Sequence, residues 1–213
     1  MGGSRREFDR ELEAIEAKVV ELFGMVAEDL PRATEALLTG NTEIVRSLAE
    51  RDRYIDDLYP KIEQLADREI LLQGPMASEQ RFLISVLRVV PELERSHDLV
   101  VSIARRAGHV LNQDLSPRSR GLIEQMGNLA SEMWREAVDC WRRRDRSAAI
   151  ALGPRDQEMD ELYATLMAEL ASGRMTLPVT MEMTLVARFY ERLGDHAVNI
   201  ARRVTYLAGS APR

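Results

Sequence analysis

The amino-acid sequence predicts an all-α protein made of two tandem three-helix bundles, in which an internal duplication produces six long antiparallel helices. Three observations support this prediction. Apolar residues recur every three or four positions along most of the chain, as on one face of an amphipathic helix. Hydrophobic residues make up 45% and charged residues 30% of the 213 positions, a balance typical of a folded globular chain. Two sequence motifs also occur twice in the same order.

The first three helices are bounded by residues that commonly end helices. Thr39-Gly40-Asn41 ends the first helix, and Gly74-Pro75 ends the second. Pro60 and Pro91 lie inside the helical patterns, so kinks are expected in the second and third helices. The third helix follows one apolar grid, in which Ser96 is the only hydroxyl residue: Val86, Val89, Leu93, Ser96, Val100, Ile103, Ala107 and Val110.

The last three helices follow a break at residues 112–117. Ser116 is a favourable N-cap and Pro117 a favourable first helical residue, so the fourth helix is expected to begin there and run to about Arg144. Gly153-Pro154 is expected to interrupt the fifth helix, which ends near Ser172-Gly173. Pro178 begins the sixth, which carries the clearest apolar periodicity: Met183, Val186, Tyr190, Leu193, Ala197, Ile200, Val204 and Leu207.

The duplication is visible when the two halves are compared. Residues 51–59 match residues 155–163 at five identical positions, with an offset of 156 − 52 = 104. Residues 94–98 and 103–106 match residues 191–195 and 200–203, with an offset of 191 − 94 = 97. Helix composition alone does not produce two blocks in the same order. We therefore expect one three-helix repeat at 1–111, a second at 112–213, and an apolar seam that runs through both.

The repeated motifs carry pairs of carboxylates spaced by four residues, which places both members of a pair on one helix face. Because the second and third helices of each repeat are expected to be antiparallel neighbours, two pairs would meet in each half. Acidic oxygen ligands suit cations such as Mg, Ca, Mn or Fe. A solvated helix surface is the competing interpretation of every pair. The candidate metal ligands are Asp52, Asp56, Glu94 and Asp98 in the first repeat, and Asp156, Asp160, Glu191 and Asp195 in the second.

Composition excludes several classes of function. The net charge of −6 argues against a general nucleic-acid binder, which needs basic residues to neutralise phosphates. The single cysteine, Cys140, and the lack of a long apolar run near the N-terminus predict a cytoplasmic protein. No glycine-rich phosphate loop and no nucleophile pattern are present, so we do not expect an enzyme.

Two rival functions remain open. Glu94-Arg95-Ser96-His97 has the E-x-x-H form of di-iron carboxylate proteins, but Gly194 takes the corresponding place in the second repeat. A generic helical adaptor or scaffold without metal is the other rival, because long apolar seams can also bind partner helices.

A stretch at 191–202 is similar to the signature of the PhoU family of phosphate-signalling regulators: ERLGDHAVNIAR. The stretch at 73–82 resembles the connection before that signature in the first repeat: QGPMASEQRF. The resemblance implies a PhoU-like fold and a cytoplasmic regulator without enzymatic activity. Such a regulator represses the phosphate-starvation response at high phosphate, through contacts with the transporter ATPase subunit and the sensor histidine kinase.

The same resemblance implies a homodimer, contact with membranes only through its partners, and a multinuclear Fe, Mn, Zn or Mg centre on the paired carboxylates named above. The first repeat departs from the family pattern, since Ser96-His97 stands where the second repeat has Leu193-Gly194. Glycine lets another group approach the helix closely. His97 would either block that approach or add a nitrogen ligand, although a lone helical histidine is more often a surface residue.

Overall fold

The computed structural model describes residues 2–108 and 115–208, and this part of the chain is helical without any strand. The predicted six-helix, all-α fold is confirmed. A short 3₁₀ turn, η1, follows the third helix. The elements are α1 (Gly2–Thr39), α2 (Thr42–Gln73), α3 (Ala77–Arg105), η1 (Arg106–Gly108), α5 (Pro117–Arg143), α6 (Arg146–Ala171) and α7 (Leu177–Ala208).

Local capping interactions explain most of these boundaries. The Asn41 side chain accepts hydrogen bonds from the backbone N–H groups of Glu43 and Ile44, at 3.0 and 3.3 Å, and so begins α2. Gly74 ends α2 in the left-handed conformation, with φ of 53°. Ser116 caps α5 by accepting from the Ser119 backbone N–H at 3.0 Å, as its position before Pro117 predicts.

The predicted interruption at Gly153-Pro154 is wrong, because α6 continues through both residues. Pro154 has no N–H for the carbonyl of Ile150, one turn earlier. Both Pro154 and Ile150 are exposed, so water can hydrate that carbonyl and the helix tolerates the proline. Helices α2 and α3 likewise continue through Pro60 and Pro91.

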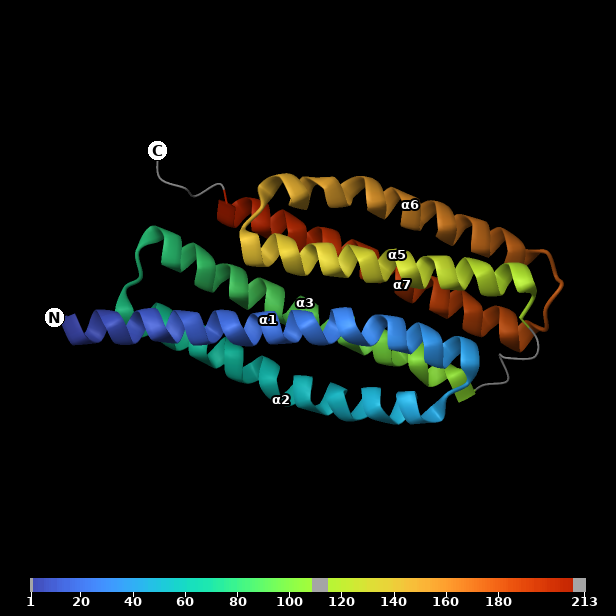
Figure 1. The fold of residues 1–213 in the computed structure, drawn as a ribbon, viewed down its shortest axis with the longest axis horizontal. Coiled ribbons are helices and arrows are strands. Elements are labelled where there is room, and N and C mark those ends of the chain that lie inside the picture. The colour runs from blue at the N-terminus through green and yellow to red at the C-terminus, as the bar shows by residue number, and fades with distance from the viewer. Residues whose placement is uncertain (1, 109–114, 209–213) are drawn as a thin grey trace.

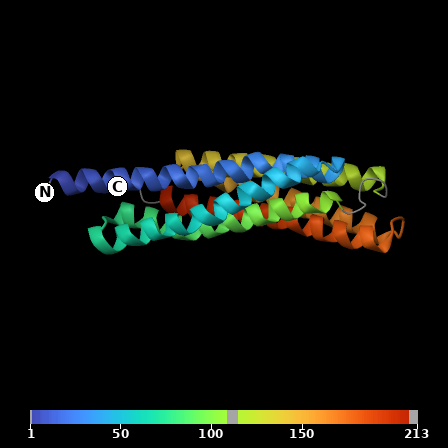
Figure 2. The same cartoon turned by 90° about the horizontal axis from the view of Figure 1, so that it is seen from below.

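The helices form one elongated bundle (Figure 1), and the view turned by 90° shows how flat it is (Figure 2). Within the first half, α2 packs against α1 and α3; within the second, α6 packs against α5 and α7. The halves meet where α1 packs on α5 and α3 packs on α7. Helices α2 and α6 therefore lie on opposite sides of a shared centre, as Figure 1 shows.

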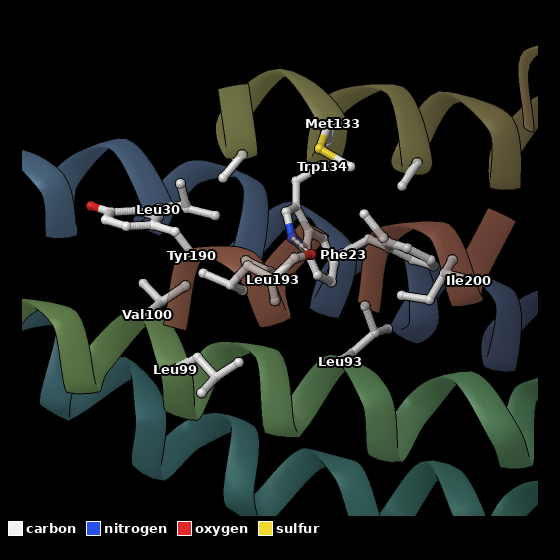
Figure 3. Close-up of a cluster of buried hydrophobic side chains, with 14 of the residues drawn as sticks. Phe23, Leu30, Leu93, Leu99, Val100, Met133, Trp134, Tyr190, Leu193 and Ile200 are labelled. Atoms are coloured by element: carbon white, nitrogen blue, oxygen red, sulfur yellow. Dashed lines mark hydrogen bonds between the residues drawn. The ribbon is translucent and has the colours of Figure 1, made fainter. Parts of the chain in front are cut away.

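A single buried cluster of apolar side chains extends through all six helices. At its centre, Phe23 of α1 packs on Trp134 of α5, with ring centroids 6.5 Å apart (Figure 3). The ring of Trp141, also of α5, lies 5.6 Å from that of Phe23. The Trp134 indole N–H donates to the Leu193 carbonyl of α7 at 3.1 Å, so this buried polar group has a partner. The expected continuous apolar seam is present.

Close polar contacts join the two halves inside this core. The Thr34 and Tyr190 hydroxyls lie 2.8 Å apart, and both side chains are buried. Gly127 lets α5 approach α1 closely, because a Cβ there would lie 2.5 Å from the Thr34 hydroxyl oxygen. The predicted boundary between the repeats, at 111/112, falls outside the described residues. No helix in the described ranges is long and apolar enough to cross a membrane.

Candidate functional site

The duplicated carboxylates lie at equivalent places in the two halves. In the first half they come from α2 and α3, and in the second from α6 and α7, which pack together in each case. The exposure of each carboxylate also matches that of its counterpart. The half-buried residues are Asp52, Glu94, Asp156 and Glu191, and the exposed ones are Asp56, Asp98, Asp160 and Asp195. The duplication therefore preserves both the position and the degree of exposure of the four charges.

The carboxylates of the second half lie close enough to repel one another. Burial raises the pKa of Asp156, and the charges of Asp195 and Asp160 raise it further. Burial also raises the pKa of Glu191, against the opposing effect of Arg188, while Asp195 and Asp160 again raise it. The Oε2 atom of Glu191 is buried and has no hydrogen-bond partner in the described part of the chain. A bound cation would reduce the repulsion between the carboxylates and would give Oε2 of Glu191 a partner.

Gly194 lets side chains of the second half pack closely against α7. A Cβ at this position would lie 3.1 Å from Oδ1 of Asp156, 3.5 Å from Cγ of Met159 and 3.6 Å from Cε of Met133. The glycine therefore lets the Asp156 carboxylate approach the backbone of α7, as the sequence predicts. A side chain here would displace that carboxylate or narrow the space around it.

His97 fills the equivalent place in the first half, and the interpretation of it as a surface residue is wrong. Its side chain is 0% exposed. Its Nδ1 lies 2.8 Å from Oδ1 of Asp52, and its Nε2 lies 3.0 Å from Oδ2 of Asp29. Burial opposes the charged imidazolium, but the hydrogen bonds to Asp29 and Asp52 outweigh it, so the pKa of His97 is raised. The two carboxylates therefore favour the protonated form of His97, which lies between them.

Asp29 of α1 belongs to this network, although it lies outside the repeated carboxylate motifs. It is fully buried, and Arg32 and Arg51 contact its Oδ1 at 2.9 and 3.2 Å. The offset between the two halves shows which residue stands at the position equivalent to Asp29 in the second half. Arg51 pairs with Glu28 at 3.1 Å, and Arg155 pairs with Glu132 at 2.6 Å.

Both members of the second ion pair lie 104 positions after their counterparts, from 28 to 132 and from 51 to 155. The same offset places Met133 opposite Asp29. In the second half, a methionine and a glycine thus occupy the positions that hold an aspartate and a histidine in the first. The local environment of the shared Asp52/Asp156 position has changed from ionic to apolar.

The two halves consequently differ in how well they suit a metal ion. In the first half, Asp52 is engaged by His97 through Oδ1 and lies 3.7 Å from Arg105 through Oδ2, so protein cations already neutralise it. Burial and the neighbouring carboxylate charges nevertheless raise the pKa of Glu94 and of Asp98, as they do for the carboxylates of the second half. The difference between the halves therefore concerns Asp52 and Asp156. In the second half, Arg188 pairs with one oxygen of Glu191, and the buried, unpartnered Oε2 is the feature that fits a cation. No three His, Cys, Asp or Glu side chains within residues 2–108 and 115–208 form a preassembled metal site, so the ligands would have to converge on an ion.

The histidine of the E-x-x-H motif at 94–97 binds carboxylates, whereas in a di-iron protein it would bind iron. Both ring nitrogens of His97 are engaged by carboxylates, at 2.8 and 3.0 Å. Neither nitrogen then has a free lone pair directed at a metal beside Glu94. The single cysteine, Cys140, is buried, and burial raises the pKa of its thiol to about 11, so it packs as an apolar residue.

Comparison with known proteins agrees with this duplicated architecture. The family model described as the PhoU domain matches residues 19–107 and again residues 123–204. A curated relative from Zymomonas mobilis, named a phosphate-specific transport system accessory protein PhoU homolog, is 32% identical over 98% of this chain and 89% of its own length. A homolog of the same name from Pseudomonas putida is 30% identical over 95% of this chain and 80% of its own length.

Solved structures show the same fold. The crystal structure of PhoU from Pseudomonas aeruginosa aligns with a TM-score of 0.88 at 29% identity, covering 96% of this chain and all of that one. The phosphate transport system regulatory protein PhoU from Streptococcus pneumoniae aligns with a TM-score of 0.85 at 27% identity, covering 94% and 96% of the two chains. The two matches to the family model, together with the duplicated helix pairs that carry them, establish that this chain belongs to the PhoU family.

Proposed function

We propose that this chain is a cytoplasmic regulator of phosphate uptake and of the phosphate-starvation two-component response. It would act by contact with the ATPase subunit of the phosphate transporter and with the phosphate-sensing histidine kinase, and would repress the response when phosphate is plentiful. The observation that carries this proposal is the similarity to PhoU proteins along almost the whole chain, including relatives named as accessory proteins of phosphate-specific transport.

The architecture suits regulation by contact. Both halves share one apolar core, so a partner bound to one half acts on a body that is continuous with the other. The long outer helices α2 and α6 lie on opposite sides of the bundle, which suits two partners. Self-association as a homodimer is part of the same proposal. The chain would work without catalysis, as the accessory role of its relatives suggests.

We also propose a metal centre in the second half, on Asp156, Asp160, Glu191 and Asp195. The support comes from the mutual repulsion of these carboxylates and from the unpartnered Oε2 of Glu191. Fe, Mn, Zn and Mg all accept oxygen ligands of this kind. A bound ion would supply a local positive charge that holds α6 and α7 together at this place.

Deletion of the coding gene in its own bacterium tests the regulatory role. We expect a reporter of the phosphate-starvation response to become active in phosphate-rich medium, and a plasmid copy of the wild-type chain to silence it again. Co-purification of the tagged chain from the same cells tests the contacts, with the transporter ATPase subunit and the sensor kinase as the expected partners.

A reporter that stays silent in the deletion strain would contradict the regulatory proposal. It would leave a helical scaffold as the better interpretation. Complementation with a Glu191→Gln, Asp195→Asn variant separates the two parts of the proposal, because repression that survives loss of the metal would assign regulation to the contacts alone.

A further inference from the structure

A groove between α3 and α7, whose lining includes none of the eight predicted metal ligands, concentrates positive charge on a chain whose net charge is −6. It encloses about 700 Å³, within the range of small-molecule sites. Four arginines line it, Arg88 and Arg95 from α3 and Arg202 and Arg203 from α7, together with one acidic residue, Glu92. The charged side chains of the lining therefore sum to +3.

The single carboxylate of the lining is already occupied. Glu92 forms an ion pair with Arg95 at 2.9 Å and accepts a longer hydrogen bond from the Asn199 amide at 3.5 Å. Arg202 donates to the Asn199 side-chain oxygen at 3.2 Å, which is a neutral partner. Glu92 therefore offsets Arg95 and leaves the other three guanidinium groups of the groove without a carboxylate at ion-pair distance in the described residues.

Arg88 and Arg203 carry two of these three positive charges. Arg203 lies over the Tyr206 ring, with its guanidinium carbon 5.1 Å from the ring centroid, so its head is held at the groove wall. Burial and the nearby charge of Arg88 lower the pKa of Arg203. Repulsion between these two like charges is unfavourable, and an anion bound between them would relieve it.

Guanidinium groups bind phosphate oxygens through pairs of parallel, charge-assisted hydrogen bonds. A lining of +3 favours a multivalent phosphate over a singly charged carboxylate. The lining also includes the partly exposed apolar residues Leu87 and Pro91, which suits an organic part of a ligand. The lining is also supplied by one helix from each half, so a ligand here would contact both repeats at once.

We propose that this groove binds a small molecule with a multivalent phosphate group, held between the guanidinium groups of Arg88 and Arg203. The site is distinct from the proposed metal centre and goes beyond regulation by protein contact. It gives the chain a direct means of responding to a phosphorylated metabolite or to inorganic phosphate.

Calorimetric titration of the full chain tests the proposal. The protein is first treated with chelator, so that a metal ion in the second half cannot bind the anion instead. The probes are orthophosphate, tripolyphosphate and ATP without divalent cations, at constant ionic strength, with citrate as a multivalent carboxylate. Binding of orthophosphate would identify an inorganic ligand, and ATP binding much tighter than tripolyphosphate would identify a nucleotide.

We expect an Arg88→Gln, Arg203→Gln variant to weaken phosphate binding by at least about tenfold, because it removes two charge-assisted contacts. The matched control is Arg46→Gln, Arg135→Gln, which removes the same charge from exposed positions on α2 and α5, and we expect it to change the affinity by less than about twofold. All four positions are outside the buried core, and circular dichroism checks the fold of both variants.

Three results would overturn the proposal. The first is the lack of heat from all three phosphate probes at millimolar concentration. The second is an equal loss of affinity in the two double variants, which would mean that only the overall charge matters. The third is tighter binding of citrate, or of a polyglutamate peptide, than of any phosphate probe, which would identify the groove as a contact for acidic protein segments.

Discussion

The two halves of the chain place equivalent carboxylates on equivalent helix faces but differ in what contacts one of them, Asp52 in the first half and Asp156 in the second. In the first half, His97 and Arg105 contact Asp52, so the protein supplies its own cations. In the second, Gly194 and Met133 leave Asp156 near its repelling neighbours. A duplicated scaffold thus preserves where the charges lie, while the residue that faces Asp52 or Asp156 differs between the halves. Under the proposed function, an added ion would balance the charges of the second half.

The largest expected effect concerns metal content. For protein purified without chelator, we expect the double variant Glu191→Gln, Asp195→Asn to contain no bound metal. Inductively coupled plasma mass spectrometry measures the metal content. The matched variant Glu94→Gln, Asp98→Asn alters the equivalent residues of the first half and is expected to retain the metal of the wild type. Gly194→Ala is expected to fall between them, because its Cβ would lie 3.1 Å from the Asp156 carboxylate.

Equal metal content in the wild type and the Glu191→Gln, Asp195→Asn variant would refute the metal site. A half-loss in both double variants would refute the comparison instead, since it would mean that the first half also binds an ion.

The next effect concerns stability. His97→Ala removes one cation from the fully buried Asp29, which keeps Arg32 and Arg51. Removing one partner of a buried ion pair costs about 3–5 kcal/mol, and we expect about 3 kcal/mol here in urea denaturation. The control is His196→Ala in the second half. The His196 ring lies 2.9 Å from the Ser96 hydroxyl, and burial lowers the pKa of His196. This variant therefore loses a neutral contact, which is worth about 1 kcal/mol. Equal losses in the two variants would contradict a charged His97.

The same histidine predicts a pH dependence. The folded state raises the pKa of His97 above its ordinary value, because hydrogen bonds to Asp29 and Asp52 outweigh burial. Folding therefore favours the protonated ring, and this contribution is complete below the ordinary histidine pKa of about 6.5. It is lost as the pH rises through the folded pKa. The measurement is the free energy of unfolding of the wild type and of His97→Gln, from weakly acidic to alkaline pH. We expect the difference between the two proteins to decrease as the pH rises. A constant difference would show that the ring is neutral.

Local signals explain which parts of the fold could be predicted from sequence. Ser116-Pro117 and Gly74 determine the backbone of their own neighbours, so the predicted boundaries of α2 and α5 are confirmed. Gly153-Pro154 carries the same kind of signal, but its effect depends on whether the Ile150 carbonyl faces water, which only the packed structure determines. The prediction of an interruption failed for that reason.

The burial of His97 could not be read from its own motif, because its partner Asp29 lies on another helix. A signal was nevertheless present. Asp29 falls among Val26, Leu30 and Ala33 on the apolar face of α1, where a carboxylate needs a buried partner. Extending the offset of 104 to α1 pairs Asp29 with Met133 and marks the position where the halves differ.

The smallest expected effect compares two equivalent arginines. Arg155 contacts Glu132 and Glu136, which are 51% and 40% exposed, so Arg155→Gln should cost at most about 0.5 kcal/mol. Arg51 makes the same contact with exposed Glu28 but also lies 3.2 Å from the buried Asp29. Arg51→Gln should therefore cost about 1 kcal/mol more than Arg155→Gln, since it weakens a charged hydrogen bond that water cannot replace. Urea denaturation of both variants measures the difference, and combining Arg51→Gln with Asp29→Asn should abolish it. If the two single variants unfold at the same urea concentration, Asp29 does not depend on Arg51, and the ionic network of the first half is limited to His97, Arg32 and the two carboxylates.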